Sequence, residues 1–207
     1  AENVAVGFNS GASISSGVQN TLIGTQSGDA LSDADFNVAV GRNALSGDTL
    51  GSKSTAVGHS ALNVQNFTVA TNTDNTAVGF NSGASVTTGI QNPLIGSGAG
   101  DALTGSGFSG TTRQSGADFN VAVGQAALGA DTLGSKSVAV GHSALLTQNF
   151  TTATDSFNVA VGHAAGTSVT TGVQNTFVGS LAGDALNTGQ NNVAMGYLAL
   201  SGDTKGE

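Results

Sequence analysis

Apolar positions along the chain recur in a short pattern that ends on a glycine. In each copy the residue before this marker glycine is Val, Ile or Met, the second before it is Ala, Leu or Phe, and the fourth is Asn or Ser. β-Branched residues favour strands, and successive side chains of a strand point to opposite faces. Each copy, Asn-Val-Ala-Val-Gly in its commonest form, therefore predicts one short strand, followed by a turn and a return segment.

The marker glycines follow one another at a basic step of 17 residues, with three longer intervals. Self-similarity at a fixed period is typical of stacked repeat folds, and 17 residues fit one coil of a parallel β-solenoid. We therefore predict an all-β solenoid of about eleven coils. The marker glycines are Gly7, Gly24, Gly41, Gly58, Gly79, Gly96, Gly124, Gly141, Gly162, Gly179 and Gly196.

A longer period lies above this step, because four kinds of copy occur in a fixed order. The second kind carries Gly-Asp-Ala-Leu, the third carries Gly-Ser-Lys, and the fourth carries Gly-His-Ser-Ala-Leu. Duplication of a four-coil block explains the order, with blocks at about 1–74 and 75–157 and a partial block at 158–207. The predicted organisation is one solenoid domain over residues 1–207, and we expect it to be a segment of a longer repetitive protein.

The two faces of the predicted strand differ in side-chain size. Val4 and Val6 share one face, whereas Ala5 and Gly7 share the other. The Ala/Gly face suits the cramped interior of a coil. Apolar residues on both faces are typical of strands that are buried on both sides, so the Val/Ile face is expected to need a second covering surface.

The composition supports a narrow interior. The chain has 32 Gly, only 5% aromatic residues and 9% charged residues, against a usual charged fraction of about 25%. Low-complexity disorder is the competing interpretation, but 38% of residues are hydrophobic, and disorder usually goes with low hydrophobicity and high net charge. The net charge of −8 and five scattered Lys and Arg residues argue against nucleic acid or anionic lipid as a partner, and no apolar run approaches the ~20 residues of a membrane span.

The repeat Asn-Val-Ala-Val-Gly followed by x-x-Ala/Ser, from Asn3 to about Leu200, resembles the YadA-like head repeat of trimeric autotransporter adhesins, and similar repeats occur in phage tail fibres. The resemblance implies a left-handed parallel β-roll in a side-by-side homotrimer, on a cell surface or in a virion fibre. It places the Val/Ile face at the trimer centre. The expected interface residues are Val4, Val6, Ile23, Val40, Val57, Val78, Ile95, Val123, Val140, Val161, Val178 and Met195.

Three stretches break the 17-residue step: an insertion around 104–116, and two longer loops at 63–74 and 146–156 that both contain Gln-Asn-Phe-Thr. Loops on a rigid scaffold often carry binding. The candidate ligand contacts are Phe67, Phe108, Arg113 and Phe150. The competing interpretation is that the Phe rings cover a side of the solenoid and the loops are tolerated insertions.

His59, His142 and His163 each follow a marker glycine, so a threefold axis would bring three copies together in a ring around a metal ion or an anion. This column also contains Phe, Thr, Arg, Ser, Gln and Tyr, which favours histidines without a ligand, and no cofactor is expected. The Asn column before each strand predicts either a hydrogen-bonded ladder along the rod or simple turn residues.

Catalysis lacks its usual components, because the chain has no Cys, few His and Lys, and no nucleophile or carboxylate cluster outside the repeat. We therefore expect a non-enzymatic structural and adhesive module that pairs with itself and with a cell-surface glycan or matrix protein. A glycan-processing β-solenoid enzyme or phage tail spike is the alternative, and an ice-binding solenoid is a third.

Overall fold

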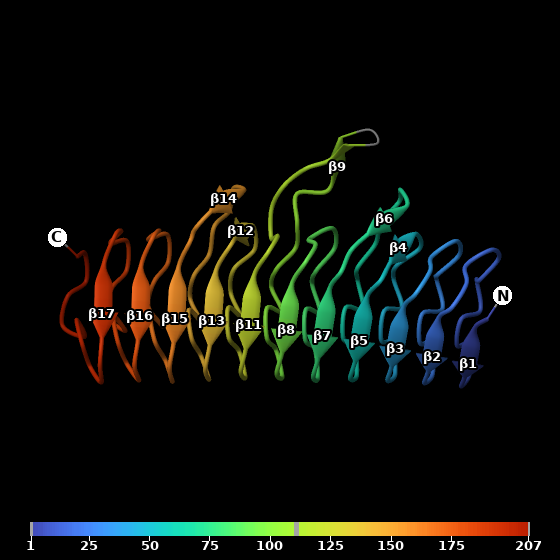
Figure 1. The fold of residues 1–207 in the computed structure, drawn as a ribbon, viewed down its shortest axis with the longest axis horizontal. Helices are drawn as coiled ribbons and strands as arrows, with labels where there is room; N and C mark the ends of the chain where they lie inside the picture. Colours follow the sequence, from blue (N-terminus) through green and yellow to red (C-terminus); the bar gives the residue numbers. More distant parts are fainter. Residues whose placement is uncertain (1, 110–111, 207) are drawn as a thin grey trace.

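The computed structural model describes residues 2–109 and 112–206, apart from the side chains of Phe108 and Arg113. The fold is an all-β parallel solenoid of about eleven turns, as the repeat predicts. The coils are stacked side by side into a rod with the two termini at opposite ends (Figure 1).

One strand of each coil contributes to a single parallel sheet that runs along the rod. Neighbouring strands pair in register, so that Ala39 stands beside Ala56 and Val40 beside Val57. The 17-residue step therefore converts each position of the repeat into a column. The strands of this main sheet are β1 (Val4–Val6), β2 (Thr21–Ile23), β3 (Val38–Val40), β5 (Thr55–Val57), β7 (Thr76–Val78), β8 (Pro93–Ile95), β11 (Val121–Val123), β13 (Val138–Val140), β15 (Val159–Val161), β16 (Thr176–Val178) and β17 (Val193–Met195).

The marker glycines form one such column directly after the strands. Their φ angles lie between 120° and 144°, in a region that L side chains rarely adopt. A Cβ on Gly24 would lie 2.5 Å from the carbonyl oxygen of Gly41 in the next coil. Both the turn and the close approach of successive coils therefore require glycine at this position.

The middle residue of each strand from β2 to β17 of the main sheet points into the coil and is buried, as in Leu22, Ala39 and Phe177, whereas Ala5 in the terminal strand β1 is exposed. The return segment adds one further apolar side chain at one of two places. Where the fourth residue after the marker is Gly28, Leu31 fills the interior, and where it is Leu45, the later position is the polar Asp48. Each such coil therefore receives one bulky apolar side chain from its return segment, as a closely packed interior requires.

The Asn column forms a ladder inside the rod, which decides between the two interpretations of its role. The Oδ1 atom of Asn20 accepts the backbone N–H of Asn37 at 2.9 Å, and the Nδ2 of Asn20 donates to the Ala34 carbonyl at 2.7 Å. Ser54 interrupts the ladder. There Gln65 bridges the gap, donating to Ser54 Oγ at 2.8 Å and accepting from Asn75 Nδ2 at 2.8 Å.

The residues beyond the 17-residue step extend from one side of the rod (Figure 1). β6 (Thr71–Asn72) of the first long loop pairs in parallel with β4 (Gly51–Ser52) of the preceding coil, and β14 (Thr154–Asp155) of the second long loop pairs in the same way with β12 (Gly134–Ser135). The insertion folds as an antiparallel hairpin of β9 (Phe108–Ser109) and β10 (Thr112–Arg113) that rises from the rod. The coil stack is therefore continuous beneath all three extensions.

Candidate functional site: an apolar sheet face and a cleft at the insertion

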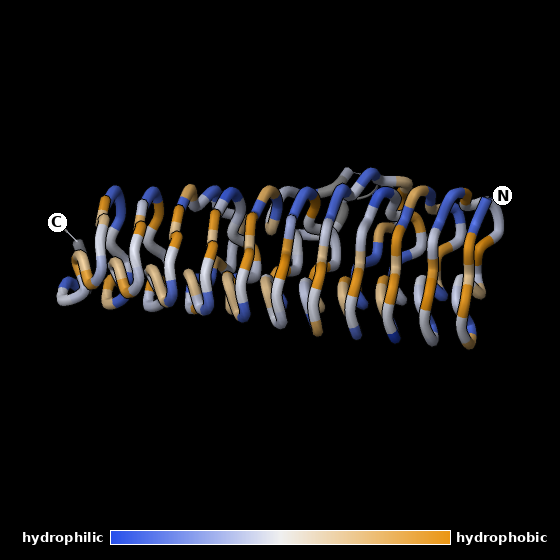
Figure 2. Tube along the Cα trace, turned by 60° about the horizontal axis from the view of Figure 1, so that its bottom comes forward, coloured by the Kyte–Doolittle hydropathy of each residue, from blue (hydrophilic) through white to orange (hydrophobic). Residues whose placement is uncertain are grey.

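The outer face of the main sheet carries the twelve residues that we expected at an interface between chains. Between the two terminal strands, Ile23, Val78 and Ile95 expose 39%, 36% and 42% of their surface. Five further residues of this face are half-buried: Val40, Val57, Val123, Val140 and Val178. Val4, Val6, Val161 and Met195 are exposed as well. Figure 2 shows the hydrophobic segments of successive strands side by side along the rod. The structure thus leaves a branched aliphatic row without a covering surface in the single chain.

The column after the marker glycines continues this face, and the three histidines lie in it. Each is exposed. His59 stacks on Phe80 with ring centroids 5.4 Å apart, and His142 stacks on His163 at 5.2 Å. Within residues 2–109 and 112–206, no group of three or more His, Cys, Asp or Glu is placed to hold a metal ion. A histidine ring around a threefold axis depends on the predicted trimer.

Phe67 and Phe150, predicted as ligand contacts, are buried, with exposed fractions of 0% and 5%. The prediction is wrong for these two rings, because each long loop folds back and turns its Phe into the side of the solenoid. This matches the competing interpretation of the loops. The other two candidates, Phe108 and Arg113, pair with each other in the β9–β10 hairpin, and their side chains lie outside the described part of the chain.

A buried carboxylate holds each of these Phe residues in place. Asp48 Oδ1 accepts the backbone N–H groups of Phe67 at 3.0 Å and Gly51 at 3.1 Å, and Asp48 Oδ2 accepts Gln65 Nε2 at 2.6 Å. Desolvation raises the pKa of Asp48 above its usual value, and these hydrogen bonds oppose the increase. Asp131 repeats the arrangement with Phe150 and Gln148, and its pKa is raised for the same reason. The hydrogen-bond partners named for Asp48 and Asp131 are groups of the long loops and the adjoining coils, so the two carboxylates hold the loops in place.

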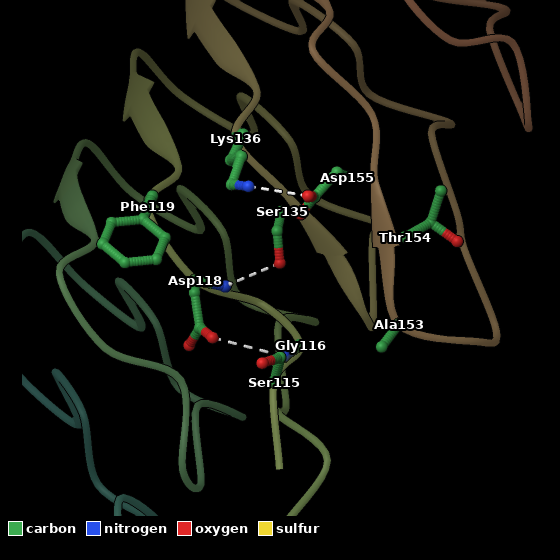
Figure 3. Close-up of a pocket in the computed structure, with 9 residues that line it drawn as sticks. All are labelled: Ser115, Gly116, Asp118, Phe119, Ser135, Lys136, Ala153, Thr154 and Asp155. Carbon is green, nitrogen blue, oxygen red and sulfur yellow. Dashed lines mark hydrogen bonds and ion pairs between the residues drawn. The ribbon is translucent and has the colours of Figure 1, made fainter. Parts of the chain in front are cut away.

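A cleft of about 350 Å³ lies where the end of the insertion meets the second long loop. Its walls come from three consecutive coils, and Figure 3 shows their side chains around the opening. The insertion supplies its last residues, the next coil supplies an aromatic ring, and the long loop supplies the opposite wall. The lining residues are Ser115, Gly116, Asp118, Phe119, Ser135, Lys136, Ala153, Thr154 and Asp155.

The cleft has one apolar wall and one charged wall. Phe119 is 47% exposed. In the adjacent coil, Lys136 Nζ lies 2.6 Å from Asp155 Oδ2, and both side chains are well exposed. The same ammonium lies 5.2 Å from the ring centroid of Phe157, within the range of a cation–π contact. The cleft therefore offers a ring, a cation and a carboxylate to solvent together.

Asp118 forms the floor of the cleft and is held by the backbone around it. Its Oδ1 accepts the N–H of Ile90 at 3.0 Å and its Oδ2 accepts the N–H of Gly116 at 3.3 Å. Its own backbone N–H donates to Ser135 Oγ at 3.1 Å. These bonds tie the end of the insertion to the neighbouring coils, so the cleft is built on the rigid part of the rod.

The sequence interpretation missed this cleft. Its remaining candidates, Phe108 and Arg113, belong to the insertion. The cleft is lined by the end of the insertion, by the second long loop and by four residues of the repeat itself, Asp118, Phe119, Ser135 and Lys136. A signal was present in the alignment of the two complete blocks. The position of Asn72 in the first block corresponds to Asp155 in the second, and that of Asp74 corresponds to Phe157. After β13 the second block thus has a carboxylate and a ring where the first block has an amide and a carboxylate.

Comparison with known proteins adds no relative to this picture. No helix in the described part of the chain is long and apolar enough to cross a membrane. No protein-family model, curated protein or solved structure matches the chain.

Proposed function

We propose that this chain is a structural and adhesive module of a trimeric fibre on a cell surface or a virion, in which three rods pack through the outer face of the main sheet. The observation that carries the proposal is the unbroken row of aliphatic side chains along eleven in-register strands, Val or Ile in ten of them and Met195 in the last. The resemblance to YadA-like heads, on the repeat Asn-Val-Ala-Val-Gly, supports the same arrangement.

The energetics favour a partner for this face. Fully burying one Val or Ile side chain contributes roughly 1.5–3 kcal/mol, and each residue in this row is already partly covered, so its gain is smaller. The gain recurs at every coil, whereas the loss of translational and rotational freedom, about 4–15 kcal/mol, is incurred once per association. A long in-register row therefore suits an obligate assembly, and a lone rod would expose a continuous apolar stripe.

The mass of the chain in solution tests the assembly. We expect light scattering to give about 60 kDa, three times the 20.0 kDa of one chain. Val78→Asp places a charge on the outer face and is expected to shift the mass toward 20 kDa. Val64→Asp is the matched control, because Val64 is 41% exposed, close to the 36% of Val78, but lies in a turn outside the main sheet. A stable 20 kDa species for the unaltered chain at micromolar concentration would overturn the trimer.

The adhesive role assigns a cell-surface glycan or matrix protein as the partner and no catalytic activity to the rod. The extensions that rise from one side of the stack support display of a binding surface on a rigid scaffold. Binding to glycan and matrix-protein arrays is the expected result. Release of shortened products from a polysaccharide panel would instead favour a depolymerase, and binding to neither array would count against adhesion.

A further inference from the structure

We propose that the cleft between Phe119 and Asp155 binds one neutral sugar unit of a glycan. The inference rests on the adhesive part of the proposed function and names its ligand class. It does not depend on the trimer, because all nine lining residues belong to one chain. Its volume of about 350 Å³ lies at the lower end of the roughly 300–1,000 Å³ of small-molecule sites.

The apolar wall suits the C–H face of a sugar ring. Phe119 exposes nearly half of its surface at the edge of the cleft, and Figure 3 shows its ring beside the opening. The face of an aromatic ring carries partial negative charge, and the C–H groups on one side of a pyranose carry partial positive charge. Stacking the two buries apolar surface on both without placing a hydroxyl group against the ring.

The charged wall suits vicinal hydroxyl groups. A hydroxyl group both donates and accepts hydrogen bonds, an ammonium group only donates, and a carboxylate only accepts. Lys136 and Asp155 place these two complementary groups 2.6 Å apart, so one hydroxyl can accept from Lys136 while its neighbour donates to Asp155. The ammonium has three hydrogens, and the ion pair with Asp155 uses one of them.

The charge balance of the cleft selects against ionic ligands. Two carboxylates, Asp118 and Asp155, face one ammonium, Lys136, and the whole chain has a net charge of −8. An anionic sugar or a phosphate group would therefore meet net repulsion. A metal ion is disfavoured as well, because no cluster of three ligating side chains occurs in the described residues.

The first block provides a built-in control. Phe36 and Lys53 occupy the same repeat positions as Phe119 and Lys136, and Phe36 is 51% exposed, close to the 47% of Phe119. The first block has no insertion, and Asn72 stands at the position of Asp155. The two rings thus share their column and exposure but differ in their surroundings, which separates a role in the cleft from a general role on the sheet face.

The experiment is a titration of the full 207-residue chain with the methyl glycosides of glucose, galactose and mannose and with their disaccharides, followed by saturation-transfer NMR. We expect saturable binding of at least one neutral glycoside, with the strongest transfer to the C–H protons of one ring face. Phe119→Ala is expected to weaken binding about tenfold, the loss of one stacking contact. Asp155→Asn and Lys136→Met should also weaken binding, whereas Phe36→Ala and Lys53→Met should leave it within about twofold.

Three results would overturn the inference: no neutral glycoside binds, only sialic acid or inorganic phosphate binds, or Phe36→Ala weakens binding as much as Phe119→Ala. Thermal unfolding of each variant checks that the exposed-site substitutions leave the rod folded. The mass of the chain, measured on the same samples, keeps the tests apart, because a trimer without sugar binding refutes only the cleft ligand. A monomer that binds sugar refutes only the assembly.

Discussion

The first and second four-coil blocks have the same columns of stacked residues, but they differ in the loops and side chains at the side of the rod. In both, a buried Asp supports a buried Phe in the long loop, Asp48 with Phe67 and Asp131 with Phe150. The second block adds the insertion, and Asp155 stands where the first block has Asn72. The comparison shows that the coil interior is fixed by packing, whereas the side of the rod is free to vary and to acquire a site.

The largest effect is expected at a marker glycine, where the two blocks should respond alike. Gly24→Ala and Gly96→Ala each place a Cβ 2.5 Å from the carbonyl oxygen of the next coil at a φ of about 135°. Backbone strain of about 1–3 kcal/mol adds to overpacking of about 1–3 kcal/mol, so we expect a loss of roughly 4 kcal/mol. Urea unfolding measures it. Gly202→Ala is the control, because its Cβ would meet nothing within 4 Å, and an equal loss there would contradict the stacking argument.

Removal of the buried loop rings should cost nearly as much, and again equally in both blocks. Phe67→Ala and Phe150→Ala each leave a cavity at a position that is 0% and 5% exposed, for which about 3–5 kcal/mol is typical. Hydrogen exchange of the loop amides measures the loss locally, which suits a rod whose coils contact only their neighbours. A change below about 1 kcal/mol in either variant would instead favour an open loop with its ring free for a ligand.

The two pairs of substituted residues differ in how well the sequence predicts their surroundings, because the glycines occupy a repeat column and the Phe rings do not. Gly24 and Leu22 could be assigned to the turn and the interior because each occupies a column that recurs at a fixed step, and packing gives every member of a column the same surroundings. The same regularity places the Asn side chains in one column, and the structure shows that they form a ladder. Where the period holds, one argument places eleven residues at once.

Phe67 and Phe150 fall outside the period, so no column constrains them. Their burial depends on β4–β6 and β12–β14 pairing, which folds each loop against the coil, and on Asp48 or Asp131 capping the loop backbone. The cleft depends on two non-periodic segments, the end of the insertion and the second long loop, meeting coils of the repeat. Phe119 and Lys136 occupy repeat positions, but a repeat argument cannot place the insertion and the long loop beside them. This is why Phe119, Lys136 and Asp155 were not selected from the sequence.

A smaller effect is expected from pH at the two buried acids. Burial raises the pKa of both Asp48 and Asp131 above the ordinary Asp value of 3.8, so the folded chain binds more protons than the unfolded chain between 3.8 and the raised pKa. Their contribution to stability is therefore complete below pH 3.8 and is lost as the pH rises through the raised pKa. The unfolding free energy should fall with pH across this window, and the double variant Asp48→Asn, Asp131→Asn should fall less. Identical profiles for the two proteins would show that these acids keep their unfolded pKa.

The smallest effect should distinguish the blocks most directly, because it tests an interaction that only one of them has. Lys136 pairs with Asp155 at 2.6 Å and lies over the ring of Phe157, whereas at these positions the chain places Asn72 and Asp74 in the first block. Exposed ion pairs contribute about 0.2–1 kcal/mol, and salt screens them. Lys136→Met should therefore destabilise its loop by a few tenths of a kcal/mol more than Lys53→Met at low salt, as measured by hydrogen exchange at β14 and β6.

Asp155→Asn separates the two contributions of Lys136, since it removes the carboxylate and keeps the cation over the ring. If the difference between the blocks persists unchanged at high salt and in Asp155→Asn, the aromatic contact rather than the ion pair holds the charged wall of the cleft in place.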